Sequence, residues 1–408
     1  MSHTPIKPRR RVATRVPELT GEEPLTLPKG RRPASVIRSI APDLPAPRRE
    51  EGAVSGEDRY RVESEIGKGG MGKVLRVADT DLNREIAMKV LINSAHQSTT
   101  RRFIEEAQIT SQLEHPNMLP VHDFGINEDG DVFFTMQYVR SHDTLGEIVE
   151  RLRDGDPDTH RAYTFEKRVQ LIQQVAHALS YAHERGVIHR DIKPDNIMVG
   201  EHGQVYLVDW GVAKLLDQAE RPVPHTLRQL DGPGPDATRD GILIGTPPYM
   251  APEQILGLND EVGPRTDVYA LTVVLYELLT LNYYLGDVKD DLPSITSAVV
   301  HRKPADAESH FDPVNGRVPR SLSRICRKGL SKAPEQRFQS ADELSSALQD
   351  WLEGNAPVVC PGTMIQRGLS RYSRLIDRWP VLLPAITITA FILLAAWFVL
   401  ATALVLFP

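Results

Sequence analysis

Residues 189–196 read His-Arg-Asp-Ile-Lys-Pro-Asp-Asn, and Asp-Trp-Gly follows at residues 209–211, 18 residues after the first aspartate. Phosphoryl transfer needs a carboxylate that orients and deprotonates the incoming hydroxyl, a cation near the transferring group and two oxygen ligands for Mg²⁺. These chemistries occur, in this order, in Asp191, Lys193, Asn196 and Asp209. The first hypothesis is therefore a phosphoryl-transfer site.

A glycine-rich turn lies upstream, where residues 67–72 read Gly-Lys-Gly-Gly-Met-Gly. Such glycines let a backbone turn approach phosphate groups without obstruction by side chains. The sequence continues as a strand and not as a helix, which disfavours a dinucleotide-binding fold. Lys89 stands 22 residues after Gly67, inside an apolar strand. A lysine there is costly unless it meets a fixed anion, so the turn and the lysine together predict a phosphate site.

Two patterns divide the chain between about residues 59 and 353. Short alternating runs at 74–77, 86–90 and 132–136 predict antiparallel strands, with one helix from about Thr99 to Leu113. From Thr164 onward helical periods dominate, and residues 268–279 predict a buried helix. The expected fold class is α+β, a small sheet lobe with one helix followed by a larger helical lobe.

Taken together, these motifs resemble those of the protein kinase superfamily over about residues 59–353. The resemblance rests on the glycine turn, the strand lysine, His-Arg-Asp with an asparagine five residues on, Asp-x-Gly, and Ala-Pro-Glu at residues 251–253. Lys193 and the Gly-Thr-Pro-Pro-Tyr run at 245–249 are similar to the Ser/Thr branch. Residues 333–340 and the C-terminal apolar segment are similar to the eukaryotic-like Ser/Thr kinases of bacteria.

The resemblance implies ATP and Mg²⁺ as cofactors and assigns the nucleotide site. Lys89 would contact the α- and β-phosphates and pair with a glutamate of the following helix. Glu105 and Glu106 compete for this role, and spacing favours Glu106. Met136 would be the gatekeeper. The remaining implied nucleotide-binding residues are Ile66, Gly67, Gly69, Gly72, Val74, Ala87, Gln137, Val139 and Met198.

The same resemblance assigns the catalytic roles and names protein Ser/Thr hydroxyls as the substrate. Asp191 would be the catalytic base and Lys193 the charge partner of the γ-phosphate, while Asn196 and Asp209 would be the metal ligands. Arg190 is expected to meet a phosphorylated residue of the activation segment. Thr246 would help to position the substrate hydroxyl. Two further features are expected to be structural, a Glu253–Arg337 pair and Asp267 in the buried helix.

Two substitutions depart from the family pattern, since Trp210 replaces the usual phenylalanine and Thr272 stands where many relatives have glycine. Neither removes a catalytic group. Residues 217–240 are rich in proline, glycine and charge, which predicts a long insertion in the activation segment. Thr226 and Thr238 are its candidate phosphoacceptors, so control by autophosphorylation is expected.

The two ends of the 408-residue chain differ from the middle. Residues 1–57, with 11 Lys+Arg against 7 Asp+Glu, predict a disordered tail. The kinase-like region is expected at 58–353 and a basic juxtamembrane linker at 354–380. Residues 381–407 carry no charge and predict one transmembrane helix. Four arginines before it place the preceding domain on the cytoplasmic face by the positive-inside rule.

Charge and cysteine content exclude several classes. Net charge is -6 overall, but residues 58–361 alone are strongly acidic. This argues against nucleic-acid binding and predicts that the domain favours basic substrates and stands off from anionic lipid. The two cysteines exclude a disulfide scaffold, and Cys326 is expected to be a small buried apolar residue. His177 and His183 are spaced unlike a metal pair.

Three alternatives stay open. A membrane-anchored pseudokinase scaffold would bind nucleotide or a partner without transfer, but such proteins usually lose the strand lysine, the base or the metal-binding aspartate. A small-molecule kinase is disfavoured by the Gly-Thr-Pro-Pro-Tyr run. A homodimer for trans-autophosphorylation is possible in principle, although the apolar segment has no Gly-x-x-x-Gly pattern to support it.

Overall fold

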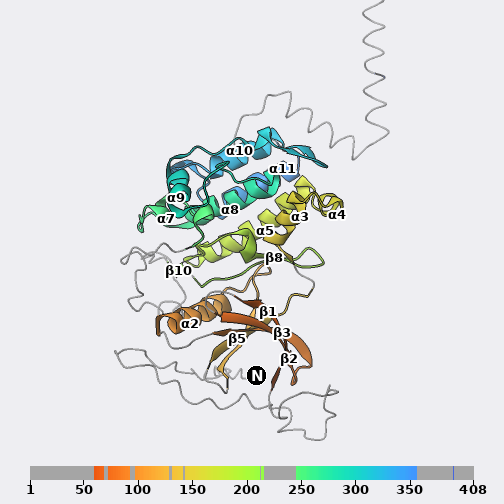
Figure 1. Ribbon diagram of the computed structural model, residues 1–408, viewed down its shortest axis with the longest axis vertical. Helices are drawn as coiled ribbons and strands as arrows, with labels where there is room; N and C mark the ends of the chain where they lie inside the picture. Colours follow the sequence, from red (N-terminus) through yellow and green to blue (C-terminus); the bar gives the residue numbers. More distant parts are fainter. Residues whose placement is uncertain are drawn as a thin grey trace, which may run out of the picture.

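The computed structural model describes residues 59–68, 72–91, 97–127, 131–140, 143–211, 213–215, 245–355 and Thr389. The chain folds into two lobes that follow one another in sequence (Figure 1). The N-lobe contains a twisted sheet with one helix, and the C-lobe is built mainly of helices. The expected α+β class with a small sheet lobe and a larger helical lobe is confirmed.

The N-lobe sheet has five antiparallel strands in the order β1-β2-β3-β5-β4. The central strand β3 pairs with β2 on one side and β5 on the other, so both of its edges are hydrogen-bonded. The strands predicted at 74–77, 86–90 and 132–136 lie in β2, β3 and β5. The elements of this lobe are β1 Tyr60–Lys68, β2 Gly72–Asp79, β3 Arg84–Leu91, α2 Gln97–Gln112, β4 Val121–Ile126 and β5 Val132–Gln137.

Alternation along the strands gives the sheet two apolar faces. One face packs Val77, Ile86 and Phe133 together. The other packs Leu91 and Phe134 with residues of α2 that include Phe103. Because β3 contributes to both faces, its backbone is held on all sides. The backbone position from which the Lys89 side chain extends is therefore fixed.

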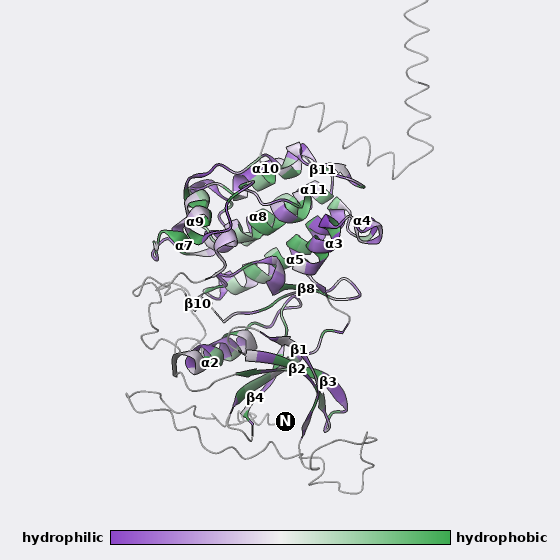
Figure 2. Ribbon diagram, in the orientation of Figure 1, coloured by the Kyte–Doolittle hydropathy of each residue, from purple (hydrophilic) through white to green (hydrophobic). Residues whose placement is uncertain are grey.

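The C-lobe is organised around α5 and α8, and Figure 2 shows the apolar character of α8. Every residue of α8 from Thr266 to Thr280 is buried, as predicted for residues 268–279. Helix α11 packs on α5, and α10 packs on α8 and α11. The longer helices are α3 Leu145–Arg153, α5 Phe165–Glu184, α8 Pro264–Thr280, α9 Leu292–His301, α10 Arg320–Gly329 and α11 Ala341–Leu352.

Short elements connect these helices and carry much of the site. A three-stranded sheet of β6, β8 and β9 lies at the start of the C-lobe, and β7 pairs with β10. The short elements are β6 Asp143–Thr144, α4 Pro157–Ala162, β7 Val187–Ile188, η1 Pro194–Asn196, β8 Ile197–Val199, β9 Val205–Leu207, β10 Lys214–Leu215, η2 Pro247–Tyr249, α7 Pro252–Ile255, η3 Ala307–Ser309, β11 Phe311–Asp312, β12 Gly316–Arg317 and η4 Pro334–Gln336.

Several predictions fall on other parts of the chain. In the part that the structure describes, no helix is both long and apolar enough to cross a bilayer. The predicted span at 381–407 lies outside that part except for Thr389. The predicted disordered tail at 1–57 lies outside it too, as do Gly69, Thr226 and Thr238 and the second cysteine of the chain, Cys360.

Candidate active site

Lys89 of β3 reaches from the sheet to the helix α2. Its Nζ lies 2.5 Å from Oε1 of Glu106, which is almost fully buried. Glu105 instead pairs with Arg101, one turn earlier on the same helix. Burial lowers the pKa of Lys89, but Glu106 and Asp209 outweigh it and raise the pKa above its usual value. The ammonium is therefore charged at neutral pH.

Asp209 brings the C-lobe to the same lysine. Its Oδ1 lies 3.6 Å from Lys89 Nζ, and its side chain remains well exposed. The residue follows β9 and has a φ of +66°, a left-handed conformation that few residues except glycine adopt. The neighbouring Trp210 is 1% exposed and its ring lies 4.6 Å from the ring of His189. The larger side chain at 210 is thus accommodated by packing within the C-lobe core.

The loop that carries Asp191 is held from below by Asp267 of α8. The Asp267 carboxylate accepts hydrogen bonds from the backbone N–H of His189 at 2.8 Å and of Arg190 at 2.9 Å. His183 of α5 contacts the same carboxylate at 2.8 Å. Burial raises the pKa of Asp267, but His183 and the backbone donors more than offset this and lower it. A buried charge thus fixes the loop, including Arg190 at a φ of +69°.

Asp191, Lys193 and Thr246 form a compact triangle. Asp191 Oδ1 accepts hydrogen bonds from both the backbone N–H and the hydroxyl of Thr246, each at 2.8 Å. Lys193 Nζ lies 3.0 Å from Thr246 Oγ1 and 3.3 Å from Asp191 Oδ2. Gly245 precedes this contact with a φ of +111° and would carry a Cβ only 3.1 Å from the Arg190 carbonyl oxygen. The close approach of these two segments therefore requires glycine.

Asn196 lies beside Asp191 at the end of η1. Its amide nitrogen donates to the Asp191 backbone carbonyl at 2.8 Å and is 3.3 Å from Asp191 Oδ2. The amide is therefore oriented with its nitrogen towards Asp191, so its oxygen is available as a ligand. The Asn196 carbonyl also accepts from Val208, the residue before Asp209. This set of one amide and one carboxylate oxygen fits a hard cation such as Mg²⁺.

The residues expected around an adenine ring lie where the two lobes meet. Met136 and Met198 pack against a small apolar cluster that contains Val139. Gln137 is the last residue of β5, and its backbone N–H donates to the Pro120 carbonyl at 3.2 Å. Ala87 is buried in β3.

The glycine turn continues the same region of the N-lobe. Gly67 pairs with Val74 across β1 and β2. Gly72 pairs with Leu91, and a Cβ there would lie 2.2 Å from the Val90 carbonyl oxygen. Ile66 is partly exposed at the end of β1.

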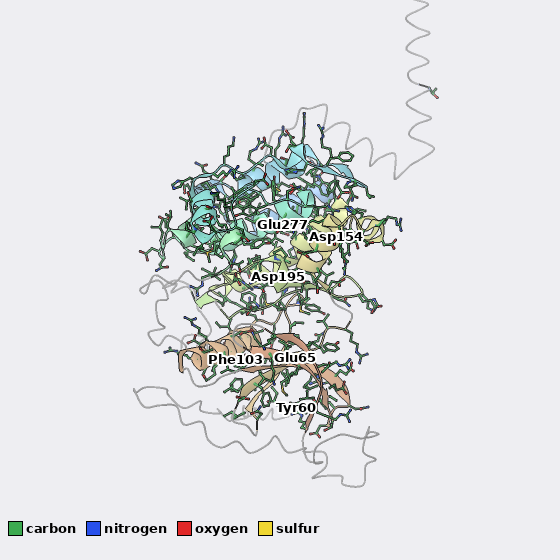
Figure 3. The ribbon with its side chains drawn as sticks, in the orientation of Figure 1. Tyr60, Glu65, Phe103, Asp154, Asp195 and Glu277 are labelled. Atoms are coloured by element: carbon green, nitrogen blue, oxygen red, sulfur yellow. The ribbon has the colours of Figure 1, made fainter. Side chains whose placement is uncertain are left out.

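The two lobes together thus present a lysine–glutamate pair, a loop carboxylate with its own lysine, and two oxygen ligands. Figure 3 shows Asp195, the neighbour of Asn196, in the part of the C-lobe nearest to the N-lobe, with Phe103 of α2 in the N-lobe. Residues 60–350 match the protein kinase domain family. The chain belongs to the protein kinase family.

Similar proteins include several bacterial kinases. The kinase chain is 34% identical over 321 residues to a serine/threonine-protein kinase PknD of Protochlamydia amoebophila, covering 74% of this chain and 31% of the relative. It is 36% identical over 301 residues to the serine/threonine-protein kinase pkn3 of Myxococcus xanthus, covering 71% and 49%. With PknD of a Chlamydia trachomatis strain the identity is 33% over 322 residues, covering 76% and 33%. The chain thus spans about a third to a half of the length of these relatives.

Two contributions to the kinase site were not anticipated from sequence. Gln254 of α7 donates its side-chain amide to the Arg190 carbonyl at 3.0 Å and so ties the Ala-Pro-Glu segment to the catalytic loop. Gly245 provides the approach described above. Gln254 directly follows the Ala-Pro-Glu motif and Gly245 directly precedes Thr246, so their positions in the sequence indicated a link to the site. Neither a glutamine nor a glycine predicts a contact with the catalytic loop by its residue type.

The structural pairs expected for the kinase domain are confirmed. Arg337 makes two hydrogen bonds to the Glu253 carboxylate at 2.7 and 2.8 Å, and both side chains are buried. Cys326 is buried too. His177 contacts the hydroxyl of Ser345 at 2.8 Å, which gives it a structural partner on α11.

Proposed function

We propose that the chain is an ATP- and Mg²⁺-dependent serine/threonine protein kinase that is anchored to a membrane, with its catalytic domain on the cytoplasmic face. The observation that carries the catalytic part is the convergence of two separate lysine–carboxylate groups. Lys89 lies between Glu106 and Asp209, and Lys193 lies beside Asp191. Each group keeps a cation where negative phosphate oxygens would lie.

Asp191 is placed to orient and deprotonate a substrate hydroxyl. The Thr246 hydroxyl donates to the Asp191 carboxylate at 2.8 Å, which supports a role for this carboxylate as the acceptor of a substrate hydroxyl. A serine or threonine side chain that enters beside Thr246 would come within reach of Asp191, which would accept its proton as the oxygen attacks the γ-phosphorus of ATP, the bond to the β–γ bridging oxygen breaks and ADP leaves. Lys193 stabilises the charge on the transferring group from the same side.

Lys89, Asn196 and Asp209 serve nucleotide and metal binding in this proposal. Lys89 would contact the α- and β-phosphates, and Glu106 keeps it in place. Asn196 and Asp209 would hold Mg²⁺ through their oxygens, and the ion would supply positive charge beside the nucleotide phosphates. The carboxylate of Asp209 is accessible, whereas the neighbouring Trp210 is buried.

Arg190 supports control by phosphorylation of the activation segment. Its guanidinium donates to the Ala213 carbonyl at 3.3 Å, close to where the described part of that segment ends. Burial lowers the pKa of Arg190 to about 10; Asp267 opposes this shift and Arg102 of α2 adds to it. A phosphate on Thr226 or Thr238 would compensate the charge of this buried guanidinium. Autophosphorylation at these threonines, in cis or between two copies, is part of the proposal.

Membrane anchoring rests on sequence. Residues 381–407 are uncharged over a length of about 40 Å as a helix, and four arginines precede them. The basic flank is typical of the cytoplasmic side. The printed names of the bacterial relatives, which describe serine/threonine-protein kinases, support the choice of substrate hydroxyl.

The experiment that tests the enzymatic proposal compares the full chain with its Asp191→Asn variant. With labelled ATP and Mg²⁺, we expect phosphate transfer to a generic basic protein and to the chain itself, and a fall of about 10²–10⁴-fold in Asp191→Asn. Asp154→Asn, an exposed aspartate at the end of α3, is the matched control and should retain activity. Nucleotide binding without transfer in the wild type would favour a pseudokinase scaffold instead.

A further inference from the structure

A short hairpin presents two apolar side chains to solvent at the edge of the C-lobe. Strands β11 and β12 pair Phe311 with Arg317 and Asp312 with Gly316. Phe311 is 71% exposed and Val314, in the turn, is 54% exposed. Phe311 and Arg317 are direct cross-strand neighbours, so they share the face of the hairpin opposite to the buried Asp312.

The hairpin is anchored from within, which makes this exposure a fixed feature of the fold. Asp312 Oδ2 accepts from the buried Arg168 of α5 at 2.7 Å. Its Oδ1 accepts from the backbone N–H groups of Val314 at 3.0 Å and Asn315 at 2.8 Å. A buried ion pair thus holds the turn rigid. This anchoring lowers the ordering cost of the backbone that presents Phe311 and Val314.

The adjoining helix α10 carries a stripe of arginines. Arg320, Arg324 and Arg327 are spaced so that they lie on one face, and all three are exposed, whereas Leu322 and Ile325 are buried. Arg320 lies 3.5 Å from Glu308 and Arg327 lies 2.7 Å from Asp306. The stripe extends for about 10 Å from the hairpin. Residues 302–328 carry seven Lys+Arg and three Asp+Glu, one of which is the buried Asp312.

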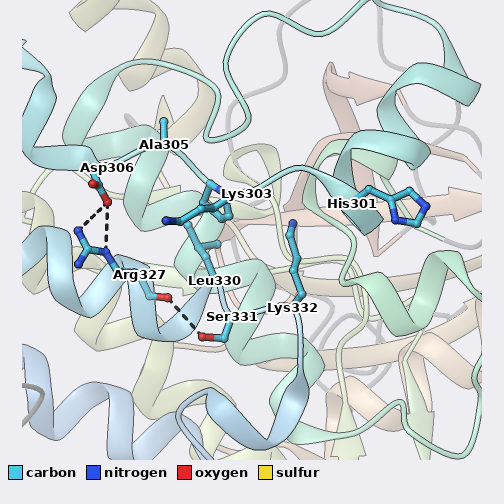
Figure 4. A pocket seen from close by; sticks show the side chains of 9 residues that line it. His301, Lys303, Ala305, Asp306, Arg327, Leu330, Ser331 and Lys332 are labelled. Atoms are coloured by element: carbon cyan, nitrogen blue, oxygen red, sulfur yellow. Dashed lines mark hydrogen bonds and ion pairs between the residues drawn. The ribbon is translucent and has the colours of Figure 1, made fainter.

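A cavity of about 260 Å³ lies at the far end of this stripe (Figure 4). Arg327, Lys303 and Lys332 contribute to its lining. Lys332 Nζ donates to the Tyr269 hydroxyl at 3.0 Å and to the Val299 carbonyl at 2.6 Å, which are neutral partners. Burial, with Arg337 nearby, lowers the pKa of Lys332 to about 8. An anionic group in the cavity would compensate this ammonium.

These features lie at the end of the C-lobe that is remote from the N-lobe (Figure 1). The described domain also ends there, at Asn355 after α11, and the uncharged segment begins at residue 381. We propose that Phe311, Val314, Arg317, Arg320 and Arg324, which we name the hairpin–α10 surface, dock the kinase domain on an anionic lipid bilayer. This inference rests on the membrane anchoring proposed above.

The chemistry of the surface matches a phospholipid interface. An aromatic ring and an aliphatic side chain enter the boundary between headgroups and acyl chains, while the arginines contact headgroup phosphates. Each arginine near an anionic leaflet raises the equilibrium constant for docking about fivefold. The 25 residues between 355 and 381 reach at most about 85 Å. An anchored chain would therefore keep the hairpin–α10 surface close to the bilayer, which favours docking as a high effective concentration does. Docking by this end leaves the site between the lobes open to protein substrates.

The test measures the distance of the hairpin from the bilayer in the full chain. A fluorophore is attached to Val314→Cys in a Cys360→Ser background, where the other cysteine, Cys326, is buried. The chain is reconstituted in vesicles of phosphatidylcholine alone or with about one third phosphatidylglycerol, both containing lipids that carry a quencher. Leu82→Cys in the N-lobe, 55% exposed, is the matched control.

We expect quenching at position 314 to be at least about threefold greater in anionic vesicles than in neutral ones, with no such difference at position 82. Arg320→Glu with Arg324→Glu should abolish the difference and leave transfer to a soluble substrate unchanged. Equal quenching at 314 and 82, or quenching that survives charge reversal, would overturn docking alone.

Flotation of the vesicles separates this proposal from the anchoring on which it rests. A chain that does not float with vesicles would overturn both. If charge reversal abolished binding of a soluble phosphopeptide and left quenching unchanged, the stripe would serve protein partners, and the membrane assignment would be wrong.

Discussion

Substitution of Gly329 by alanine should destabilise the kinase domain strongly. Gly329 is the last residue of α10 and lies against Thr272 in the middle of α8. A Cβ at position 329 would lie 2.2 Å from Thr272 Oγ1, 2.7 Å from Cγ2 and 2.9 Å from Cβ. Thr272 is fully buried and its hydroxyl donates to the Val268 carbonyl at 2.7 Å, so it has no free direction in which to move.

The magnitude follows from two opposing effects. Overpacking of a core usually costs about 1–3 kcal/mol, and three contacts below 3.0 Å place this site near the upper end. Alanine gains up to about 1 kcal/mol over glycine in a helix, and less at its end. We therefore expect a net loss of about 2 kcal/mol in the free energy of unfolding. For a domain of this size that corresponds to a fall of about 3 °C in Tm.

A double-mutant cycle identifies Thr272 as the cause. Thermal unfolding is followed by tryptophan fluorescence for Gly329→Ala, Thr272→Gly and the double variant. Removal of the threonine side chain should make the second substitution far less harmful, with a coupling of about 1.5 kcal/mol or more. Gly200→Ala is the control, since its Cβ would meet the movable end of Gln204. Additive losses, or a loss in Gly329→Ala no greater than in the control, would refute the reasoning.

Three further predictions concern buried groups. Glu106→Gln removes the carboxylate that holds the β3 lysine and should lower kcat/KM for phosphate transfer by about 10–100-fold with little change in Tm. Arg337→Ala leaves the buried carboxylate of Glu253 without its cation and should lower the free energy of unfolding, measured in urea, by about 3–5 kcal/mol. This loss should exceed the loss caused by replacing both residues with apolar ones. Burial raises the pKa of the Cys326 thiol from 9.0 to about 12. The protonated thiol therefore adds to the free energy of unfolding below pH 9, and this contribution is lost as pH rises towards 12. In a Cys360→Ser background a thiol reagent at pH 8.5 should therefore react with the unfolded chain and not with the native one.

Sequence patterns predicted the two-lobed fold because its main signals are local. The alternating runs at 86–90 and 132–136 became neighbouring strands, and the apolar run at 268–279 became the buried helix α8. The choice of Glu106 over Glu105 agrees with the distances in the structure, since spacing on a helix determines which side chain faces the sheet. Local periodicity and motif order were sufficient for these features.

Contacts between distant segments could not be predicted in the same way. Asp267 was expected to be structural, but its hydrogen bonds to the loop of His189 depend on how α8 packs beneath that loop. The close approach of Thr272 to Gly329 depends on the packing of α10 against α8. Each residue type is unremarkable alone, and its role is decided by a partner more than 50 positions away. Such partners become visible only when the packing is known.

The net charge of the domain also could not predict how charges are distributed over the folded protein. The acidic balance of residues 58–361 predicts a domain that stands off from anionic lipid, and that expectation treats the charge as evenly spread. The fold instead places residues 302–328, with seven Lys+Arg, at the end of the C-lobe remote from the N-lobe, whereas Asp209 lies 3.6 Å from Lys89 of the N-lobe strand β3. Because screening in physiological salt limits the reach of a charge to about 8 Å, the two ends act almost independently. The proposed docking of one end of the C-lobe on an anionic bilayer is therefore compatible with the expected preference for basic substrates, and the average charge of the domain predicts neither.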